Sequence, residues 1–409
     1  MTIPHFPFPV GTPLFPNHTF VFRYHQSLID HWNLSSYIHL RQEVLSADWR
    51  GNDVFGYWQV ATLDHRHNCT TQARFDHLVV ASGHNHYPRE PKLEGRQTWE
   101  VSGPGREVLH SVFYREPEVY SQRNVLVVGG GASGRDIVQQ VAGFANSTYA
   151  SVKYDPSRPI PFPHIPGVER VPALARFTPV APVFEDGTSL PHIDTVILAT
   201  GYELRFPFLS SSIHNTSIIT PLPDPSTCDM LTNNGRYLRP LFRHTFSLAP
   251  THAPRALAFV GLPQFVSYAM TDTAQALLIA HALADEDLLP PKAELLADLR
   301  VQEAELEDPA RVGHRIPQPG GGTAYQNALV RLLQERGLGG RPGLPPLGTA
   351  FTETWRVFAE KEMTRLRRAW VKVESLGEEE VERWLGRVKK GDEREWYELM
   401  VQLDEWFNE

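Results

Sequence analysis

Three closely spaced glycines follow an apolar segment about a third of the way along the chain. Gly129, Gly131 and Gly134 have G-x-G-x-x-G spacing and lie between residues 124–128 and a helical pattern that starts at Asp136. In this context the first glycine permits a tight turn, the second lets the backbone approach a pyrophosphate, and the third lets helix and strand pack closely. The helix N-terminus adds N–H groups and a positive dipole end. We therefore predict a dinucleotide site rather than a plain strand–helix turn. Its candidate residues are Gly129, Gly131, Ser133, Gly134, Arg135 and Asp136.

The residues that follow the next predicted strand indicate whether the cofactor is NAD or NADP. NAD sites usually place an acid here for the ribose 2′-hydroxyl, whereas NADP sites use basic residues for the 2′-phosphate. Asp155 follows Gly134 by 21 residues, a spacing that leaves NAD open. Lys153, Ser157 and Arg158 form a better phosphate cradle, because charged and hydroxyl donors suit phosphate oxygens. We expect the cofactor to be NADP(H).

Several motifs, taken in order, resemble those of the flavin-containing monooxygenases, especially the fungal type. The most specific is Leu198-Ala199-Thr200-Gly201-Tyr202, which is similar to the family's L-A-T-G-Y element. Residues 79–84 resemble its strand-Ala-Thr-Gly-His element, with Ser82 where the family has Thr. The other matches are the Pro/Phe-rich residues 6–16, His110-Ser111-x-x-Tyr114-Arg115 for the second half of the family's fingerprint, and residues 259–263 with Gln275. The resemblance covers roughly residues 6–333.

The resemblance implies two cofactors, FAD and NADP(H), bound by two Rossmann-like domains. In such enzymes NADPH reduces FAD, and one oxygen atom of O₂ then reaches a soft nucleophile, an amine or a sulfide of a small molecule. This is activity of the N,N-dimethylaniline monooxygenase type. The flavin carries the chemistry, so the resemblance names no catalytic acid or base. It implies that Ser82, Gly83 and His84 lie at the inter-domain cleft and that Gly261 and Leu262 lie near the flavin.

One part of the family pattern has no counterpart in this sequence. The family opens with a strand and a G-x-G-x-x-G for FAD, but before Gly129 only Gly103-Pro104-Gly105 has G-x-G spacing, and no apolar strand precedes it. The fingerprint is also imperfect, because no Phe stands at the right distance before His110. We therefore expect an incomplete flavin domain that holds FAD weakly. Two alternatives stay open: a truncated, inactive NADP-binding fragment, and a Baeyer–Villiger type monooxygenase.

The elements that carry these motifs predict an α/β fold with a helical C-terminus. Apolar segments that each end at a glycine alternate with helical patterns, which is typical of a parallel sheet. We also expect a helix at 19–32, strands at 37–44 and 57–63, loops at 317–322 and 337–348, and helices after 351 anchored by tryptophans. The predicted division is a flavin-domain remnant at 1–100 and 216–340, an NADP-binding domain at 101–215, and a helical extension at 341–409.

Composition excludes several other classes of protein. The 409 residues carry a net charge of -8, which argues against a nucleic-acid partner. Two cysteines are too few for a disulfide scaffold or a cysteine zinc site, and the histidines form no H-E-x-x-H, so no metal is expected. There is no G-x-S-x-G of a hydrolase. No transmembrane segment or signal peptide is evident, so we expect a cytoplasmic protein.

Overall fold

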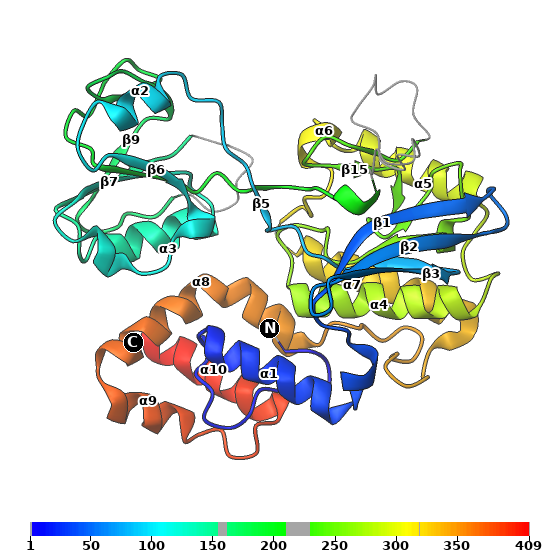
Figure 1. The fold of residues 1–409 in the computed structure, drawn as a ribbon. Coiled ribbons are helices and arrows are strands. Elements are labelled where there is room, and N and C mark those ends of the chain that lie inside the picture. Colours follow the sequence, from blue (N-terminus) through cyan, green and yellow to red (C-terminus); the bar gives the residue numbers. More distant parts are fainter. Residues whose placement is uncertain (1, 154–161, 210–229, 319, 409) are drawn as a thin grey trace. The chain divides into compact units, whose positions relative to one another are not determined.

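The computed structural model describes residues 2–153, 162–209, 230–318 and 320–408 of a mixed α/β chain (Figure 1). The described chain divides into two compact units. One combines residues 1–83 with 206–409, and the other comprises residues 84–205. The predicted NADP-binding domain, 101–215, overlaps the second unit over residues 101–205.

Residues 84–205 are built around a five-stranded sheet in the order β6-β12-β7-β8-β9. Every neighbouring pair is parallel, as the strand-then-glycine pattern predicts. Parallel sheets need cover on both faces, and β7 and β12 are accordingly apolar after their first residue. The elements are β6 (Glu107–His110), β7 (Asn124–Val128), α3 (Ala132–Val141), β8 (Ser147–Ser151), β9 (Val168–Val171) and β12 (Thr195–Leu198).

Two hydrophobic clusters cover the faces of this sheet. On one face Val125 and Val127 pack with Val138 of α3. On the other, Leu126 packs with Trp99, which is fully buried. The covering elements of that second face are α2 (Arg96–Val101) and the hairpin of β10 (Leu174–Phe177) and β11 (Pro182–Phe184). A two-stranded ribbon of β5 (Tyr87–Pro88) and β13 (Tyr202–Glu203) joins the two ends of this unit.

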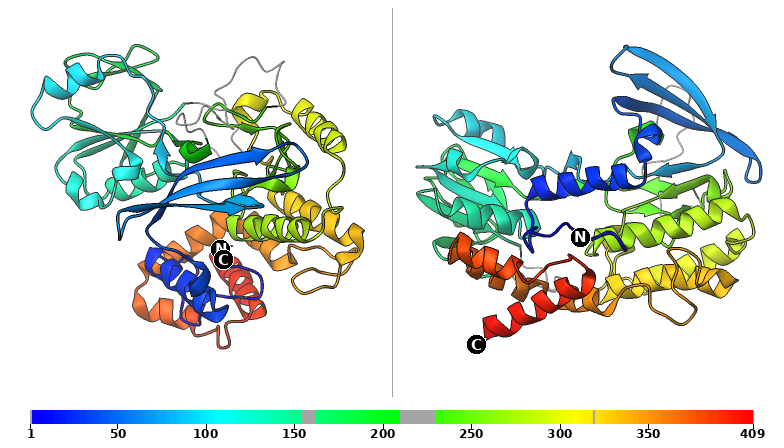
Figure 2. Two further views of the ribbon diagram at one scale, coloured as in Figure 1. Left: turned by 45° about the vertical axis from the view of Figure 1, so that its right-hand side comes forward. Right: turned by 90° about the horizontal axis from the view of Figure 1, so that it is seen from below.

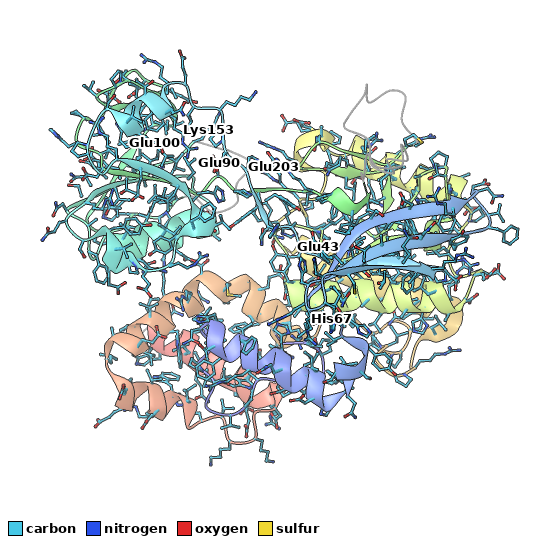
Figure 3. The ribbon with its side chains drawn as sticks, in the orientation of Figure 1. Glu43, His67, Glu90, Glu100, Lys153 and Glu203 are labelled. Atoms are coloured by element: carbon cyan, nitrogen blue, oxygen red, sulfur yellow. The ribbon has the colours of Figure 1, made fainter. Side chains whose placement is uncertain are left out.

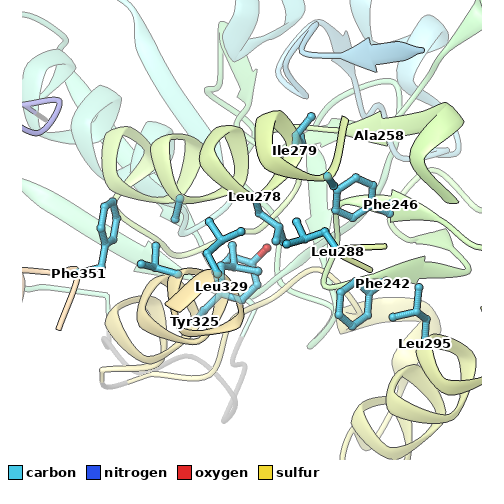
Figure 4. Close-up of a cluster of buried hydrophobic side chains, with 14 of the residues drawn as sticks. Phe242, Phe246, Ala258, Leu278, Ile279, Leu288, Leu295, Tyr325, Leu329 and Phe351 are labelled. Atoms are coloured by element: carbon cyan, nitrogen blue, oxygen red, sulfur yellow. The ribbon is translucent and has the colours of Figure 1, made fainter. Parts of the chain in front are cut away.

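The other unit contains a four-stranded sheet in the order β16-β17-β18-β4. Only β18 and β4 are parallel. Helices α4 and α7 pack on it, and Leu278, Leu329 and Phe246 meet in their shared core (Figure 4). The elements are β4 (Leu78–Val80), β16 (Leu241–Phe242), β17 (Phe246–Ser247), β18 (Leu257–Phe259), α4 (Tyr268–Ala284), α5 (Lys292–Ala304) and α7 (Gly321–Leu333).

A long antiparallel sheet and a helical cluster complete this unit. Figure 2 shows the sheet of β1 (Gln42–Gly51), β2 (Gly56–Asp64) and β3 (Cys69–Phe75) as a twisted three-stranded blade. Its Trp58 is fully buried and donates its indole N–H to the Ala256 carbonyl at 2.7 Å. The C-terminal helices are α8 (Thr354–Ser375), α9 (Glu378–Leu385) and α10 (Glu393–Asn408). As predicted, Trp370, Trp384 and Trp396 are buried in their shared core.

The remaining elements are one further helix, α1, and several short segments. They are α1 (His18–His31), η1 (Leu34–Tyr37), η2 (Ser111–Phe113), η3 (Pro117–Tyr120), η4 (Pro207–Leu209), β14 (Thr232–Asn233), β15 (Leu238–Arg239), η7 (Pro254–Ala256), α6 (Pro309–Val312) and η8 (Gln334–Leu338). Helix α1 confirms the predicted helix at 19–32. None of the helices in the described part of the chain is long and apolar enough to cross a membrane.

Two local predictions are wrong. The strand expected at 37–44 is instead η1 followed by an irregular segment, and β1 starts only at Gln42. Arg41 has a φ of 61°, which interrupts any extended strand there, and the alternating apolar residues before it are exposed. The loop expected at 317–322 contains the start of α7. Gly320 has a φ of 78° and precedes that helix, so its glycine is a helix-start residue rather than part of a flexible turn.

Candidate functional site

The loop between β7 and α3 has the shape that the G-x-G-x-x-G spacing predicts. Gly129 has a φ of 119°, and a Cβ there would lie 2.3 Å from the Ala199 carbonyl oxygen. A Cβ at Gly134 would lie 1.9 Å from the Gly129 carbonyl oxygen, so both positions require glycine. A Cβ at Gly131, in contrast, would meet nothing within 4 Å. The first and third glycines therefore close the turn, and the second leaves its backbone open to a ligand.

Helix α3 directs its N-terminus toward this open backbone. Gly131 is the N-cap residue, and it has no side chain to satisfy the first N–H groups of the helix. Ser133 and Asp136 are exposed, and Arg135 is half-buried. Helix N-termini with free N–H groups attract anions. The residues present therefore fit a dinucleotide diphosphate.

The residues expected to select NADP(H) are only partly described. Strand β8 ends at Ser151, whose hydroxyl donates to the Pro172 carbonyl at 2.8 Å. Lys153 follows it, is exposed, and is labelled in Figure 3. Asp155, Ser157 and Arg158 lie outside the described residues. The preference for NADP(H) stays a prediction from the sequence.

Residues that follow the two parallel strands of the four-stranded sheet, β4 and β18, lie at one edge of that sheet. Because β4 and β18 are parallel, Ser82 and Gly83 after β4 and Gly261 and Leu262 after β18 follow the same ends of the strands. Gly83 and Gly261 have φ values of 72° and 80°, and a Cβ at Gly83 would meet nothing within 4 Å. Leu262 is buried. In α/β sheets this carboxyl edge is where ligands bind. His84 is the first residue of the other unit.

A buried network that the sequence did not reveal holds the Gly261 turn. The Gly261 N–H donates to Gln275 Oε1 at 2.9 Å. The Gln275 amide nitrogen donates in turn to the Tyr325 hydroxyl at 3.0 Å and to the Thr245 hydroxyl at 3.1 Å. The Tyr325 hydroxyl donates to the Arg243 carbonyl at 2.7 Å. Gln275 belongs to the motif that carried the resemblance, but Tyr325 and Thr245 come from distant segments with no motif.

Asp272 lies beside the same turn. Its Oδ1 atom would be 3.6 Å from a Cβ at Gly261, and this buried oxygen has no hydrogen-bond partner in the described part of the chain. Burial raises the pKa of the carboxyl to about 6. The cause is the removal of the charged carboxylate from water, which favours the protonated form.

His110 links two of the sequence motifs within residues 84–205. Its side chain is fully buried. Its Nε2 lies 3.0 Å from the Gly201 carbonyl oxygen, and its Nδ1 accepts the Val112 N–H at 3.1 Å. The hydrogen-bond pattern therefore places the imidazole proton on Nε2, and burial lowers the pKa of His110. His110 fixes the backbone of the L-A-T-G-Y element and has no hydrogen bond to Ser111, so the pair is structural.

No group of three metal-ligating side chains is found among the residues that the structure describes. Likewise, the described residues contain only one strand–glycine–helix turn with G-x-G-x-x-G spacing, the one after β7. The described residues offer no second loop for the FAD diphosphate.

Comparison with known proteins agrees with the resemblance. A model of the family described as "Flavin-binding monooxygenase-like" matches residues 1–155 and 164–220. Flavin-containing monooxygenase FMO GS-OX5 of Arabidopsis thaliana is 26% identical over 84% of this chain and 66% of its own length. Flavin-containing monooxygenase ustF2 of Aspergillus flavus is 30% identical over 55% of this chain and 47% of its own length. The matched regions thus span less than two thirds of these relatives.

Solved structures show the same architecture. S-allyl-L-cysteine S-oxygenase from Allium sativum superposes with a TM-score of 0.71 at 25% identity, covering all of this chain and 81% of that one. Tmm from Pelagibacter sp. superposes with a TM-score of 0.63 at 22% identity, covering 88% of this chain and 71% of that one. The shared fold is the two-domain Rossmann-like flavoprotein plan. Since the family model matches more than half of the residues, the chain belongs to the flavin-binding monooxygenase-like family.

Proposed function

We propose that this chain uses NADPH, FAD and O₂ to add one oxygen atom to a nitrogen or sulfur atom of a small molecule. The observation that carries the proposal is the turn after β7. Its second glycine is open, and the α3 N-terminus has no side-chain cap. This geometry suits a dinucleotide diphosphate and occurs in a member of a flavin monooxygenase family.

The residues of the chain would act by holding and orienting the nucleotide. The N–H groups at the start of α3 would bind the diphosphate, and Gly131 would let it approach. Lys153, Ser157 and Arg158 would hold the 2′-phosphate of NADPH. Gly261 and Leu262 would lie near the ring end of the flavin, at the edge where Ser82 and Gly83 follow the parallel strand β4. The bound flavin supplies the redox chemistry.

Sulfur is the preferred acceptor atom in this proposal. The garlic protein with the same fold is titled an S-allyl-L-cysteine S-oxygenase, and the match has 25% identity and covers all of this chain and 81% of the garlic protein. The test is to purify the protein, add FAD, and follow NADPH oxidation with S-allyl-L-cysteine, N,N-dimethylaniline and cyclohexanone in parallel. Sulfoxide or N-oxide formation that keeps pace with NADPH oxidation supports the proposal. Lactone from the ketone would point to the Baeyer–Villiger reaction.

A second candidate is an NADP-binding protein that turns over no substrate. It is favoured by the single glycine turn of this type among the described residues. This candidate predicts NADPH binding without a flavin absorption band after purification, and no substrate-dependent oxidation when FAD is added. Stoichiometric bound FAD would eliminate it.

NADPH is the expected donor, and Arg158 gives the sharpest test of that choice. Arg158→Ala is expected to weaken NADPH binding by about 1.5–3 kcal/mol, the range for hydrogen bonds to charged groups, and to leave NADH binding nearly unchanged. Titration of each nucleotide by fluorescence measures both affinities. An equal loss for NADPH and NADH would show that Arg158 does not contact the 2′-phosphate.

A further inference from the structure

The turn between β16 and β17 has an unusual backbone for its residue types. Arg243 and His244 both have positive φ values, 50° and 54°. The Thr245 N–H closes the turn on the Phe242 carbonyl at 2.9 Å. Left-handed backbone is unfavourable for residues with a Cβ, and it persists where surrounding contacts hold it. The ion pair of Arg243 with Asp298, at 3.1 Å, is one such contact.

His314 determines which nitrogen of His244 carries a proton. The Leu238 N–H donates to His314 Nε2 at 3.0 Å, so this nitrogen has no hydrogen and neutral His314 is protonated on Nδ1. The two Nδ1 atoms lie 3.1 Å apart, so His314 donates to His244. His244 is then protonated on Nε2.

This turn lies at the carboxyl end of β18. The Phe259 N–H donates to the Thr245 carbonyl at 2.8 Å, and Gly261 follows two residues later. Thr245 also accepts from Gln275, the residue that holds the Gly261 turn. His244 is half-buried, and its Nε2 has no hydrogen-bond partner among the described residues. An N–H donor of fixed tautomer therefore lies on the turn beside the carboxyl end of β18, the kind of edge at which α/β sheets bind ligands.

The surrounding charges keep this donor neutral at physiological pH. Burial and the neighbouring Arg243 guanidinium lower the pKa of His244 to about 4. The Tyr325 ring stands 5.6 Å from the His244 ring. Beyond His314, Tyr237 and Arg239 both bind the Glu303 carboxylate, at 2.8 Å each. Asp298 faces Arg243 rather than the imidazole.

We propose that His244 is a ligand-binding residue whose Nε2–H donates a hydrogen bond to a ring carbonyl oxygen of a bound flavin. His314 is a positioning residue that fixes the tautomer of His244. This inference rests on the flavin part of the proposed function. It does not depend on NADPH binding or on the identity of the substrate.

Riboflavin is the probe, because it carries the ring carbonyls but lacks the diphosphate. Quenching of its fluorescence by the protein gives the affinity. His244→Phe keeps a planar ring without the donor and is expected to lose at least fivefold in affinity. His244→Gln, which retains an N–H donor, is expected to stay within threefold of the wild type. His67→Phe, at an exposed position of the same unit, is the matched control and leaves the affinity unchanged.

A second measurement reads the tautomer without any ligand. Long-range ¹H–¹⁵N spectra of the imidazoles should show His244 protonated on Nε2 in the wild type, and a mixture of tautomers in His314→Phe. Protonation of His244 on Nδ1 in the wild type would contradict the role of His314 in fixing the tautomer. Riboflavin affinity that is absent in the wild type, or equal in His244→Phe, would overturn the ligand role. Sulfide-dependent NADPH oxidation is assayed separately. Failure of the proposed monooxygenase function can therefore be distinguished from failure of the role proposed for His244.

Discussion

The three glycines after β7 differ in what a side chain would do to them. At Gly129 and Gly134 a Cβ would collide with a backbone carbonyl oxygen, whereas at Gly131 it would project into open space. Gly129 and Gly134 are thus required for the fold, whereas the backbone at Gly131 is available to a ligand. Substitutions can therefore separate binding from stability within one loop.

Gly131→Leu is expected to fold normally and to bind NADPH more weakly by at least about 1.5 kcal/mol, because the side chain blocks approach of the phosphates to the backbone N–H groups. The matched control is Gly143→Ala, where a Cβ meets only the Gln140 carbonyl at 3.6 Å. Nucleotide titration and thermal unfolding of both variants are the measurements. A Gly131→Leu variant with unchanged affinity would show that the diphosphate does not pass this backbone.

Asp272 is expected to reduce stability at neutral pH. Its folded pKa of about 6 exceeds the unfolded value of 3.8, so the folded state prefers the protonated form. The cost is therefore absent below pH 3.8, grows as pH rises through this window, and is complete above pH 6. Asp272→Asn should stabilise the protein by about 1–2 kcal/mol at pH 7.5, after a discount for partial exposure, and by little at pH 4.

Thermal unfolding midpoints at the two pH values test this prediction. Asp30→Asn, at an exposed position of α1, is the control and should change neither midpoint. A gain that is equal at pH 4 and pH 7.5 would contradict the titration argument. Proteins commonly tolerate such a cost where a polar group serves a ligand.

At the scale of elements, the sequence predicted what local patterns determine. The apolar run 124–128 with its glycines predicted β7 and α3, and the parallel neighbours followed from the alternation of strand and helix. The β16–β17 turn could not be predicted, since Arg243 and His244 adopt a left-handed backbone that tertiary contacts impose. Tyr325, more than 60 residues from Gly261 in the chain, likewise gave no local signal. Networks between distant segments depend on the fold itself.

The N-terminal segment is tied to the C-terminal helices by one buried side chain. Arg356 of α8 is 7% exposed, donates to the Thr2 carbonyl at 2.7 Å and to Glu353 at 2.8 Å, and stacks on Trp355. Arg356→Met should destabilise the protein by about 2–4 kcal/mol, because buried hydrogen-bonded groups lose their partner. It should also speed proteolysis before residue 17.

Arg394→Met is the control for this prediction, since its ion pair with Glu398 is 85% exposed on the arginine side. Its unfolding midpoint and its cleavage rate should match those of the wild type. If Arg356→Met also matched the wild type in both measurements, the N-terminal segment would be held by its aromatic packing alone.

At the scale of the whole molecule, β4 is an edge strand of the four-stranded sheet β16-β17-β18-β4 in the described chain. Unpaired strand edges invite association between molecules. Val79 lies in the middle of this edge strand and is 40% exposed. Val79→Lys should therefore lower self-association, seen by light scattering and size-exclusion chromatography, with little change in the unfolding midpoint.

Val101→Lys provides the comparison, because Val101 is more exposed, at 80%, but lies at the end of α2 and not on a sheet edge. A similar decrease in association for both variants would indicate a general effect of added charge. A decrease confined to Val79→Lys would identify the β4 edge as the contact.

The ribbon of β5 and β13 has a consequence for modularity. Residues 84–205 begin and end in two strands that pair with each other, and the Arg89 N–H donates to the Gly201 carbonyl at 2.9 Å. The N-terminal and C-terminal ends of this unit are therefore held together by hydrogen bonds within the unit. Such a segment can be excised at its ends, or circularly permuted by joining them, without breaking the sheet that carries the nucleotide loop. The excised module should melt cooperatively by itself and still bind NADPH, which makes it transferable to other scaffolds.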